Sequence, residues 1–311
     1  MTLTRAELQD GARKALGADS IAPDADKSWA QIAELGWLML AVPEEQGGLG
    51  LGGEAVAAIH YELGRALVPG PAIAQMLVIE ALAAAGQQDL LEGAMAGAKM
   101  TVAHFACDAD QASHILTSGE GFVRLVARSD FRLTAHESWD ETRRLFGVEG
   151  ASDGILIAQG EAATQLQEHL KKRLCLMLAA DSLGGADALL SLTIDYLNMR
   201  RQFDRPLSLF QALKHSVADM KVKLATAEAL LWSRAKDSEA TLAQMGALKA
   251  HAARVYAEIA EEAVQLHGGI GLTSEHHCHL FLKRAFLNCA LGGDADYLEE
   301  LAGREALESL I

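Results

Sequence analysis

Residues 170–200 restrict the fold more than any other segment, because a helix formed by them would be apolar on nearly every side. Such a helix belongs inside a bundle, where other helices cover it, and at 1.5 Å per residue it would extend roughly 45 Å. Two later runs, residues 208–235 and 241–266, are also long and alanine-rich. They suit antiparallel packing, so the second half of the chain is predicted to be a helix bundle.

The first half of the chain contains two stretches of different character. Residues 4–97 keep a helical pattern, interrupted by a glycine-dense loop at 42–53 and by Pro69-Gly70-Pro71. Between Met100 and Gln159, the segments MTVAHFA, GFVRLVA and GILIAQG are separated by Asp, Ser and Gly, as is typical of strands. These roughly sixty residues can hold only a small sheet or half-barrel.

The predicted fold class is therefore mainly α with a small β insert. We place an N-terminal helical domain at 1–99, a reduced middle β domain at 100–160 and a C-terminal helix bundle at 161–311. A chain of 311 residues can bury a substantial core, and half of its residues are apolar while only 5% are aromatic, a balance that favours helix over strand.

Charge and composition exclude several classes of partner. The formal net charge of −15 has no basic run to offset it, so we expect neither nucleic acid nor a membrane surface as a partner. No apolar run approaches the roughly 20 residues needed to span a bilayer, and the first residues form an amphipathic helix rather than a signal peptide, so we expect a cytoplasmic protein. The four cysteines lie far apart and are expected to be reduced.

Three blocks, in order and at suitable distances, resemble the acyl-CoA dehydrogenases. They are ELGWLMLAVPEEQGGLGLGG at 34–53, YLNMRRQFDRPLSLFQALKHSVADM at 196–220 and AVQLHGGIGLTSEHHCHLFLKRA at 263–285. The resemblance covers almost the whole chain. It implies an N-terminal helical domain, a middle β domain and a C-terminal four-helix bundle, and it implies α,β-dehydrogenation of an acyl-CoA thioester with FAD. An electron-transfer flavoprotein is the electron acceptor that the resemblance implies.

The second and third blocks carry the implied cofactor contacts. A cation and amide donors at a helix end can hold a dinucleotide pyrophosphate, and adjacent glycines let the backbone approach a ligand closely. The resemblance assigns FAD contacts across a subunit interface to ten residues: Arg200, Gln202, Phe203, Phe210, Gln211, Gln265, Leu266, His267, Gly268 and Gly269. Taken alone, the arginines could equally be a solvated helix end, and the double glycine a structural helix stop.

Two other motifs invite a functional interpretation that we reject. The loop at 42–53 nearly satisfies a glycine-rich nucleotide fingerprint, but it follows a helical segment where a Rossmann loop must follow a strand. The run Glu275-His276-His277-Cys278-His279 is rich in metal-binding side chains. Consecutive helical residues diverge in direction, however, so only pairs three or four apart share a face and a metal site is improbable.

The catalytic carboxylate of the family has no counterpart at its usual position. Where most members have a glutamate shortly after the third block, this chain has Gly292. Members that supply the base from the long buried helix would place it near Leu174, with an arginine near Cys175. Asp181 and Asp294 are the nearby carboxylates, and both have ordinary structural alternatives as a helix packing residue and a turn residue.

The middle domain is also smaller than in full-length relatives. Residues 138–151 resemble its end, but a counterpart to the hairpin that covers the flavin ring is missing. Some bacterial relatives work as heterotetramers of catalytic subunits and shorter subunits without a base, acting on steroid side chains or similar bulky acyl groups. This chain resembles the shorter subunit, which implies a longer catalytic acyl-CoA dehydrogenase as partner. A homo-oligomer with an unusual base and a flavin-free scaffold remain as alternatives.

Overall fold

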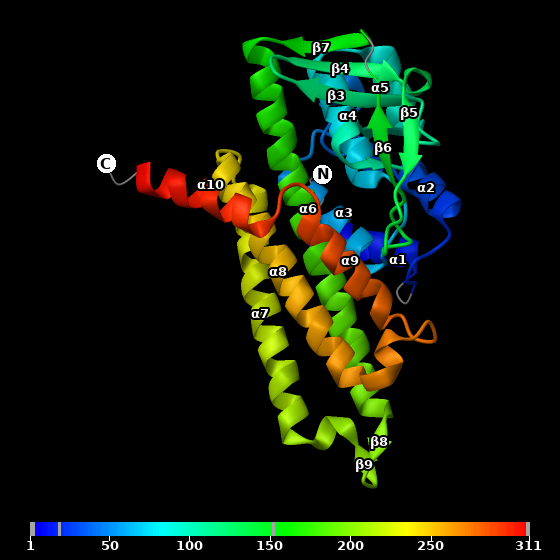
Figure 1. The fold of residues 1–311 in the computed structure, drawn as a ribbon, viewed down its shortest axis with the longest axis vertical. Helices are drawn as coiled ribbons and strands as arrows, with labels where there is room; N and C mark the ends of the chain where they lie inside the picture. The colour runs from blue at the N-terminus through cyan, green and yellow to red at the C-terminus, as the bar shows by residue number, and fades with distance from the viewer. Residues whose placement is uncertain (1–3, 18–19, 151–152, 309–311) are drawn as a thin grey trace. The chain divides into compact units, whose positions relative to one another are not determined.

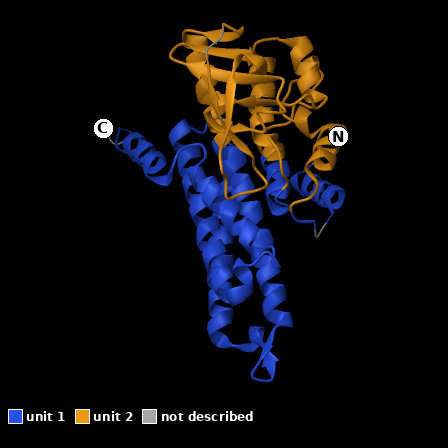
Figure 2. Cartoon of the chain, turned by 45° about the vertical axis from the view of Figure 1, so that its right-hand side comes forward, with its two compact units in different colours: residues 1–21, 57–67, 175–311 blue, residues 22–56, 68–174 orange. Residues whose placement is uncertain are grey.

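The computed structural model describes residues 4–17, 20–150 and 153–308. The chain forms two compact units, one made of residues 1–21, 57–67 and 175–311 and the other of residues 22–56 and 68–174. Figure 2 shows the two units in different colours. The helical stretch, the strand stretch and the later helices all occur where the sequence predicts them, which confirms the fold class. The predicted division at 99 and 160 does not coincide with the two units and stays a prediction.

The first unit is helical and contains the bundle (Figure 1). Its elements are α1 (Arg5–Leu16), most of α3 (Gly53–Arg65), the later part of α6 (Glu161–Met199), β8 (Arg201–Gln202), β9 (Arg205–Pro206), η5 (Leu207–Leu209), α7 (Gln211–Lys236), α8 (Leu242–His267), η6 (Gly268–Leu272), α9 (Cys278–Ala290) and α10 (Ala295–Glu308). In Figure 1, α6, α7 and α8 run side by side along the length of the bundle, and α9 packs on α8.

Helix α6 forms the centre of this unit's core. Its leucines and alanines between residues 176 and 197 are buried against apolar side chains of α3, α7, α8 and α9. Gly184 lets α3 approach at backbone distance, because a Cβ there would lie 1.9 Å from the carbonyl oxygen of Tyr61. Any larger residue at 184 would force the two helices apart.

The length and hydropathy of α6 correct one statement made from the sequence. By these two measures α6 could cross a membrane, although the sequence suggested no such segment. However, 83% of its most apolar 18-residue window is buried within the protein, as for the central helix of a bundle.

The second unit combines short helices with two small sheets. Besides the first residues of α3 and the first part of α6, its helices are α2 (Ala25–Glu34), η1 (Trp37–Met39), η2 (Glu44–Gln46), α4 (Ala72–Ala84), α5 (Gln88–Met95), η3 (Ala103–Phe105) and η4 (Arg128–Asp130). One sheet has the order β1 (Met100–Val102), β3 (His114–Gly119), β4 (Phe122–Ala127), β7 (Ile155–Gln159), and the other has the order β2 (Ala106–Cys107), β6 (Leu145–Glu149), β5 (Arg132–Ala135). All pairings are antiparallel except that of β1 with β3.

The glycine loop at 42–53 is a compact turn between helical elements. It follows η1, contains η2 and leads into α3, so its surroundings are those of a helix connection and not of a βαβ unit. Gly47 and Gly50 have positive φ, and a Cβ at Gly48 would lie 2.0 Å from the carbonyl oxygen of Val42. The glycines are therefore required by the backbone path of the turn.

Candidate functional site

The end of α6 presents Arg200 to solvent. Its backbone N–H donates to the carbonyl of Tyr196 at 2.8 Å, which is the last helical hydrogen bond, and its carbonyl accepts from Leu207 N at 2.8 Å. The backbone is thus fixed on both sides while the side chain is exposed. Among residues 4–17, 20–150 and 153–308, no side chain pairs with the Arg200 guanidinium. A fixed, unpaired cation at a helix end is suited to an anionic ligand.

A tight hairpin follows Arg200 and displays Phe203. Strands β8 and β9 pair with Gln202 opposite Arg205, which leaves Phe203 and Asp204 as a two-residue loop. Both loop residues have positive φ, 51° and 61°, as a type I′ turn requires. Glycine, asparagine and aspartate adopt such angles easily, but phenylalanine does so only with strain. The Phe203 side chain is nevertheless 86% exposed, so the strain is not offset by burial of its ring.

Aromatic and cationic groups continue from the hairpin into the start of α7. The guanidinium carbon of Arg205 lies 4.0 Å from the ring centroid of Phe210, and the Phe203 and Phe210 rings meet edge to face at 6.1 Å. Gln211 is the first residue of α7 and is exposed. The predicted residues of the second block therefore lie together at one end of the bundle, near β8 and β9 in Figure 1.

The third block ends α8 beside this region. Tyr196 Oη donates to the carbonyl oxygen of His267 at 3.2 Å, which joins the end of α8 to the end of α6. Gln265, Gly268 and Gly269 are exposed, and a Cβ added at either glycine would meet no atom within 4 Å among the described residues. Leu266 and His267 have buried side chains, so only their backbone could reach a ligand. At the end of the third block, the backbone of Gly268 and Gly269 is therefore exposed, with no neighbouring atoms that would keep a ligand away from it.

The α9–α10 connection, where the family has its usual base, is closed by a buried lysine. Gly292 and Gly293 have positive φ of 73° and 101°. Lys249 on α8 is 1% exposed and donates to the carbonyls of Cys289 at 2.9 Å and Gly293 at 2.5 Å. Burial lowers the pKa of this lysine. One carbonyl in the last turn of α9, that of Cys289, and one in the connection, that of Gly293, are thus satisfied internally.

Asp294 caps α10. Its Oδ1 accepts the backbone N–H of Tyr297 at 2.9 Å, as an N-terminal helix cap does. This is the turn role that the sequence suggested as the alternative to a base.

Asp181 is enclosed in a polar network inside the bundle. It is 3% exposed, and its carboxylate accepts from Arg284 Nη1 at 3.1 Å and from Asn288 Nδ2 at 2.7 Å. The Asn288 amide also donates to Ser182 Oγ at 3.0 Å. A general base must reach the substrate carbon at hydrogen-bonding range, whereas this carboxylate faces an arginine that is fully buried. The arrangement is that of a structural ion pair.

The histidine-rich run does not assemble a metal site among the described residues. His276 Nδ1 accepts the backbone N–H of Cys278 at 3.2 Å, and His279 Nδ1 donates to the carbonyl of His276 at 2.8 Å. The two side chains therefore shape the turn before α9.

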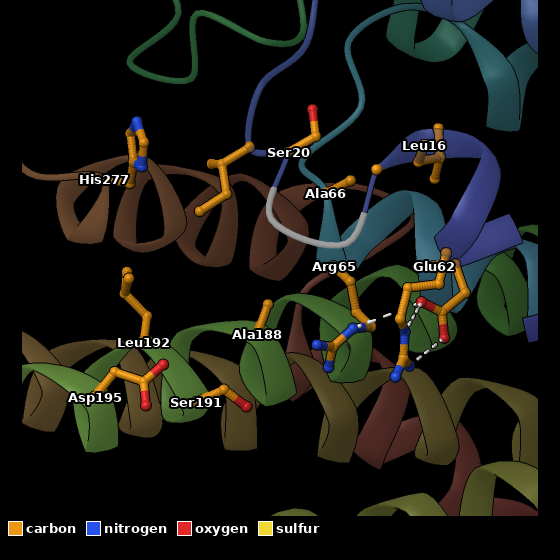
Figure 3. A pocket seen from close by; sticks show the side chains of 13 residues that line it. Leu16, Ser20, Glu62, Arg65, Ala66, Ala188, Ser191, Leu192, Asp195 and His277 are labelled. Carbon is orange, nitrogen blue, oxygen red and sulfur yellow. Dashed lines mark hydrogen bonds and ion pairs between the residues drawn. The ribbon is translucent and has the colours of Figure 1, made fainter. Parts of the chain in front are cut away.

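A cavity of about 230 Å³ with a mixed polar and apolar lining lies within the first unit (Figure 3). It is lined by α1, α3 and α6 together with His277. Both arginines of its lining are paired with carboxylates, because Arg13 donates to Glu62 at 3.0 and 2.8 Å, and Arg65 lies 3.5 Å from the same carboxylate and also pairs with Asp187. This cavity could not be predicted from the sequence, since α1, α3 and α6 are far apart along the chain.

The comparisons with known proteins agree with this architecture. The family model "Acyl-CoA dehydrogenase, N-terminal domain" matches residues 2–95, and "Acyl-CoA dehydrogenase, C-terminal domain" matches residues 171–307. The acyl-CoA dehydrogenase IpdE2 of Mycolicibacterium smegmatis is 36% identical over 273 residues, which are 85% of this chain and 83% of that protein.

Two solved structures show the same fold. The first, a variant of the Tcur3481-Tcur3483 steroid ACAD, has a TM-score of 0.87 and 24% identity, covering 98% of both chains. The second, the ChsE4-ChsE5 complex from Mycobacterium tuberculosis, has a TM-score of 0.83 and 23% identity, covering 99% of this chain and 98% of that one. From the fold, the two matching family models and the relative that aligns over most of its length, we conclude that this chain belongs to the acyl-CoA dehydrogenase family.

Proposed function

We propose that this chain is the non-catalytic subunit of a hetero-oligomeric, FAD-dependent acyl-CoA dehydrogenase. In this proposal it holds the pyrophosphate and adenosine end of FAD at an interface with a longer catalytic subunit. The observation that carries the proposal is a contrast. Arg200 is an exposed cation without a partner in the described structure, whereas the position of the usual base is a glycine in a turn that Lys249 closes.

The residues present suit one end of FAD. Arg200 offers a cation to the pyrophosphate, the turn at Gly268 and Gly269 lets the backbone approach, and the exposed ring of Phe203 offers an apolar surface for an adenine base. These groups would bind and orient the cofactor. FAD, when bound, supplies the acceptor for the hydride from the acyl-CoA thioester, and the partner subunit would supply the carboxylate base.

The relatives support a mixed assembly and suggest a substrate class. The ChsE4-ChsE5 structure is described as a complex, and the Tcur3481-Tcur3483 protein is described as a steroid ACAD. By analogy, the complex that contains this chain would oxidise a bulky acyl-CoA thioester and pass electrons to an electron-transfer flavoprotein. The homo-oligomeric alternative lacks a base in this chain, because Asp181 and Asp294 already hold structural hydrogen bonds.

The first test is native mass spectrometry of the protein isolated from its own cells. We expect an assembly with a longer, glutamate-bearing relative and one FAD for each unlike pair of subunits. A homo-oligomer that carries one FAD per chain would overturn the proposal.

The second test uses Arg200→Ala in the isolated complex. Loss of a charge-assisted contact worth about 1.5 to 3 kcal/mol should weaken FAD binding by roughly ten- to a hundredfold. Arg304→Ala is the matched control, because Arg304 is an exposed arginine on α10 that pairs with Glu300. We call the residues proposed to hold FAD the FAD clamp. Equal FAD affinity in both variants would show that Arg200 does not belong to it.

A further inference from the structure

Three aromatic rings from three separate elements meet beneath the two cofactor segments. Tyr196 lies on α6, His267 is the last residue of α8, and His276 belongs to the turn before α9. The Tyr196 and His267 rings stack with centroids 4.5 Å apart and planes 25° apart. The His276 ring packs on His267 at 4.5 Å and meets Tyr196 edge to face at 6.0 Å. We call these three residues the ring cluster.

Tyr196 contacts both segments at once. Its carbonyl accepts the N–H of Arg200 at 2.8 Å, and its hydroxyl donates to the carbonyl of His267 at 3.2 Å. Arg200 is the proposed cation for the pyrophosphate, and the His267 carbonyl directly precedes the Gly268-Gly269 turn. A single residue therefore connects the two proposed FAD segments, through its backbone carbonyl to Arg200 and through its side-chain hydroxyl to His267.

His267 is held in one orientation. Its Nδ1 donates to the carbonyl of Ala263 at 2.7 Å, so the neutral ring carries its proton on Nδ1. Its Nε2 is buried and has no hydrogen-bond partner among the described residues, and the side chain is only 4% exposed. Burial lowers the pKa of His267, since a second proton would need a partner at Nε2. The ring is therefore held in the orientation in which it stacks on Tyr196.

The turn after His267 is packed directly onto this residue. A Cβ added at Gly271 would lie 3.0 Å from His267 Cβ and 3.2 Å from the carbonyl oxygen of Val264. The 3-10 turn η6 thus packs against the end of α8, and the position of η6 depends on where the His267 backbone lies.

From these contacts we infer that Tyr196 and His267 are positioning residues for the dinucleotide, because together they set the separation between Arg200 and the Gly268-Gly269 turn. The inference rests on the proposed FAD clamp and gives a role to two side chains, those of Tyr196 and His267, that would not touch the cofactor themselves. Productive contact with a pyrophosphate requires both segments at a fixed spacing, and binding energy is lost when either one shifts.

The test is FAD binding to the isolated complex, measured by titration of the apoprotein with FAD. Tyr196→Leu removes the ring stack and the hydroxyl, and we expect its dissociation constant for FAD to rise about tenfold; Tyr196→Phe keeps the ring and should lose about threefold, as for one hydrogen bond. Tyr297→Leu is the matched control, because Tyr297 is a 58% exposed tyrosine on α10. Its FAD affinity should equal that of the wild type.

A double-mutant cycle separates positioning from general destabilisation. If Tyr196 acts by placing Arg200, Tyr196→Leu should cost little additional FAD affinity in the Arg200→Ala background, so the two effects are not additive. Full additivity would overturn the positioning role. If Arg200→Ala weakens FAD binding but neither Tyr196 variant does, the positioning role fails while the clamp stands. If no variant changes FAD binding, the clamp itself fails.

Discussion

The helical unit has two polar regions that differ in how their charges are satisfied. In the clamp region, formed by the end of α6, the β8–β9 hairpin and the end of α8, polar side chains such as Arg200 and Gln202 are exposed and one turn is strained. In the closed region, formed by Lys249, Asp181, Arg284, Asn288 and the α9–α10 connection, the same kinds of groups are buried and bind one another.

This difference in burial separates polar groups that are available to a ligand from polar groups that only stabilise the fold. A structural polar network lowers its energy by satisfying its own members, because an unsatisfied buried group is costly. A binding surface must keep donors available until the ligand arrives. By this criterion the clamp region is equipped for a ligand, whereas the polar groups around the usual base position are satisfied by one another.

The largest effect is expected for Arg284→Ala in the closed region. Removing the arginine leaves the Asp181 carboxylate buried without its cation, so the free energy of unfolding should fall by about 3 to 5 kcal/mol. Urea denaturation measures the change. Arg254→Ala, which breaks an exposed pair with Glu299, is the control and should cost at most about 1 kcal/mol. Equal stability of the two variants would show that the Asp181 network is not structural.

A smaller effect is expected for Lys249→Met. The change keeps the length and apolar stem of the side chain but leaves the carbonyls of Cys289 and Gly293 without their donor, at a cost of about 2 kcal/mol. FAD affinity should be unchanged, because the lysine lies in the closed region. Lys223→Met, at an exposed pair with Glu258, provides the comparison. Loss of FAD from Lys249→Met alone would break the distinction between the two regions.

In the clamp region, one substitution should stabilise the protein. Asparagine adopts positive φ more easily than phenylalanine, so Phe203→Asn should raise the free energy of unfolding by about 1 kcal/mol while weakening FAD binding. Thermal denaturation and FAD titration of the same sample report both quantities. A variant that is less stable than the wild type would show that the ring contributes packing that outweighs the strain.

The smallest effect is a pH dependence from the ring cluster. Burial lowers the pKa of His267 in the folded protein below the usual value of about 6.5, so the unfolded chain binds the proton more readily. The stability tied to neutral His267 is therefore complete above about pH 6.5 and is lost as the pH falls to the lower, folded pKa.

The variant His267→Phe tests this assignment. Between the lowered pKa of folded His267 and about pH 6.5, it should reduce the slope of the unfolding free energy against pH. The reduction should be less than about 1.4 kcal/mol per pH unit, because only one proton is involved. His215→Phe, which removes an exposed histidine of α7, is the matched control for the loss of an imidazole. An unchanged slope in His267→Phe would exclude this histidine as the source.

The sequence predicted the fold because its signals are local or periodic. The long apolar helix, the alanine-rich helices after it and the short strands between Met100 and Gln159 are all visible in windows of ten to forty residues, and the structure confirms them. The membrane criterion met by α6 shows the limit of such windows, since a buried helix and a spanning helix have the same composition.

The site was predictable only where the resemblance supplied residues. Tyr196 and Lys249 were missed because their partners lie far along the chain, at His267, Cys289 and Gly293. A single lysine in an alanine-rich helix usually indicates a solvated face, and only the packing of the α9–α10 connection reveals that Lys249 is buried. Likewise, Asp181 meets an arginine 103 residues away.

The β8–β9 hairpin has a consequence for the speed of ligand capture. A loop that orders only when its ligand arrives loses conformational entropy at that moment, and association is slow when most encounters find the wrong conformer. Here the turn at Phe203 and Asp204 is already closed by backbone pairing and by the bond from Arg201 to the Asp204 carbonyl. Folding has therefore ordered the backbone of this turn in advance. Under the proposed function, a dinucleotide that reaches this end of the bundle would need to order only the exposed side chains.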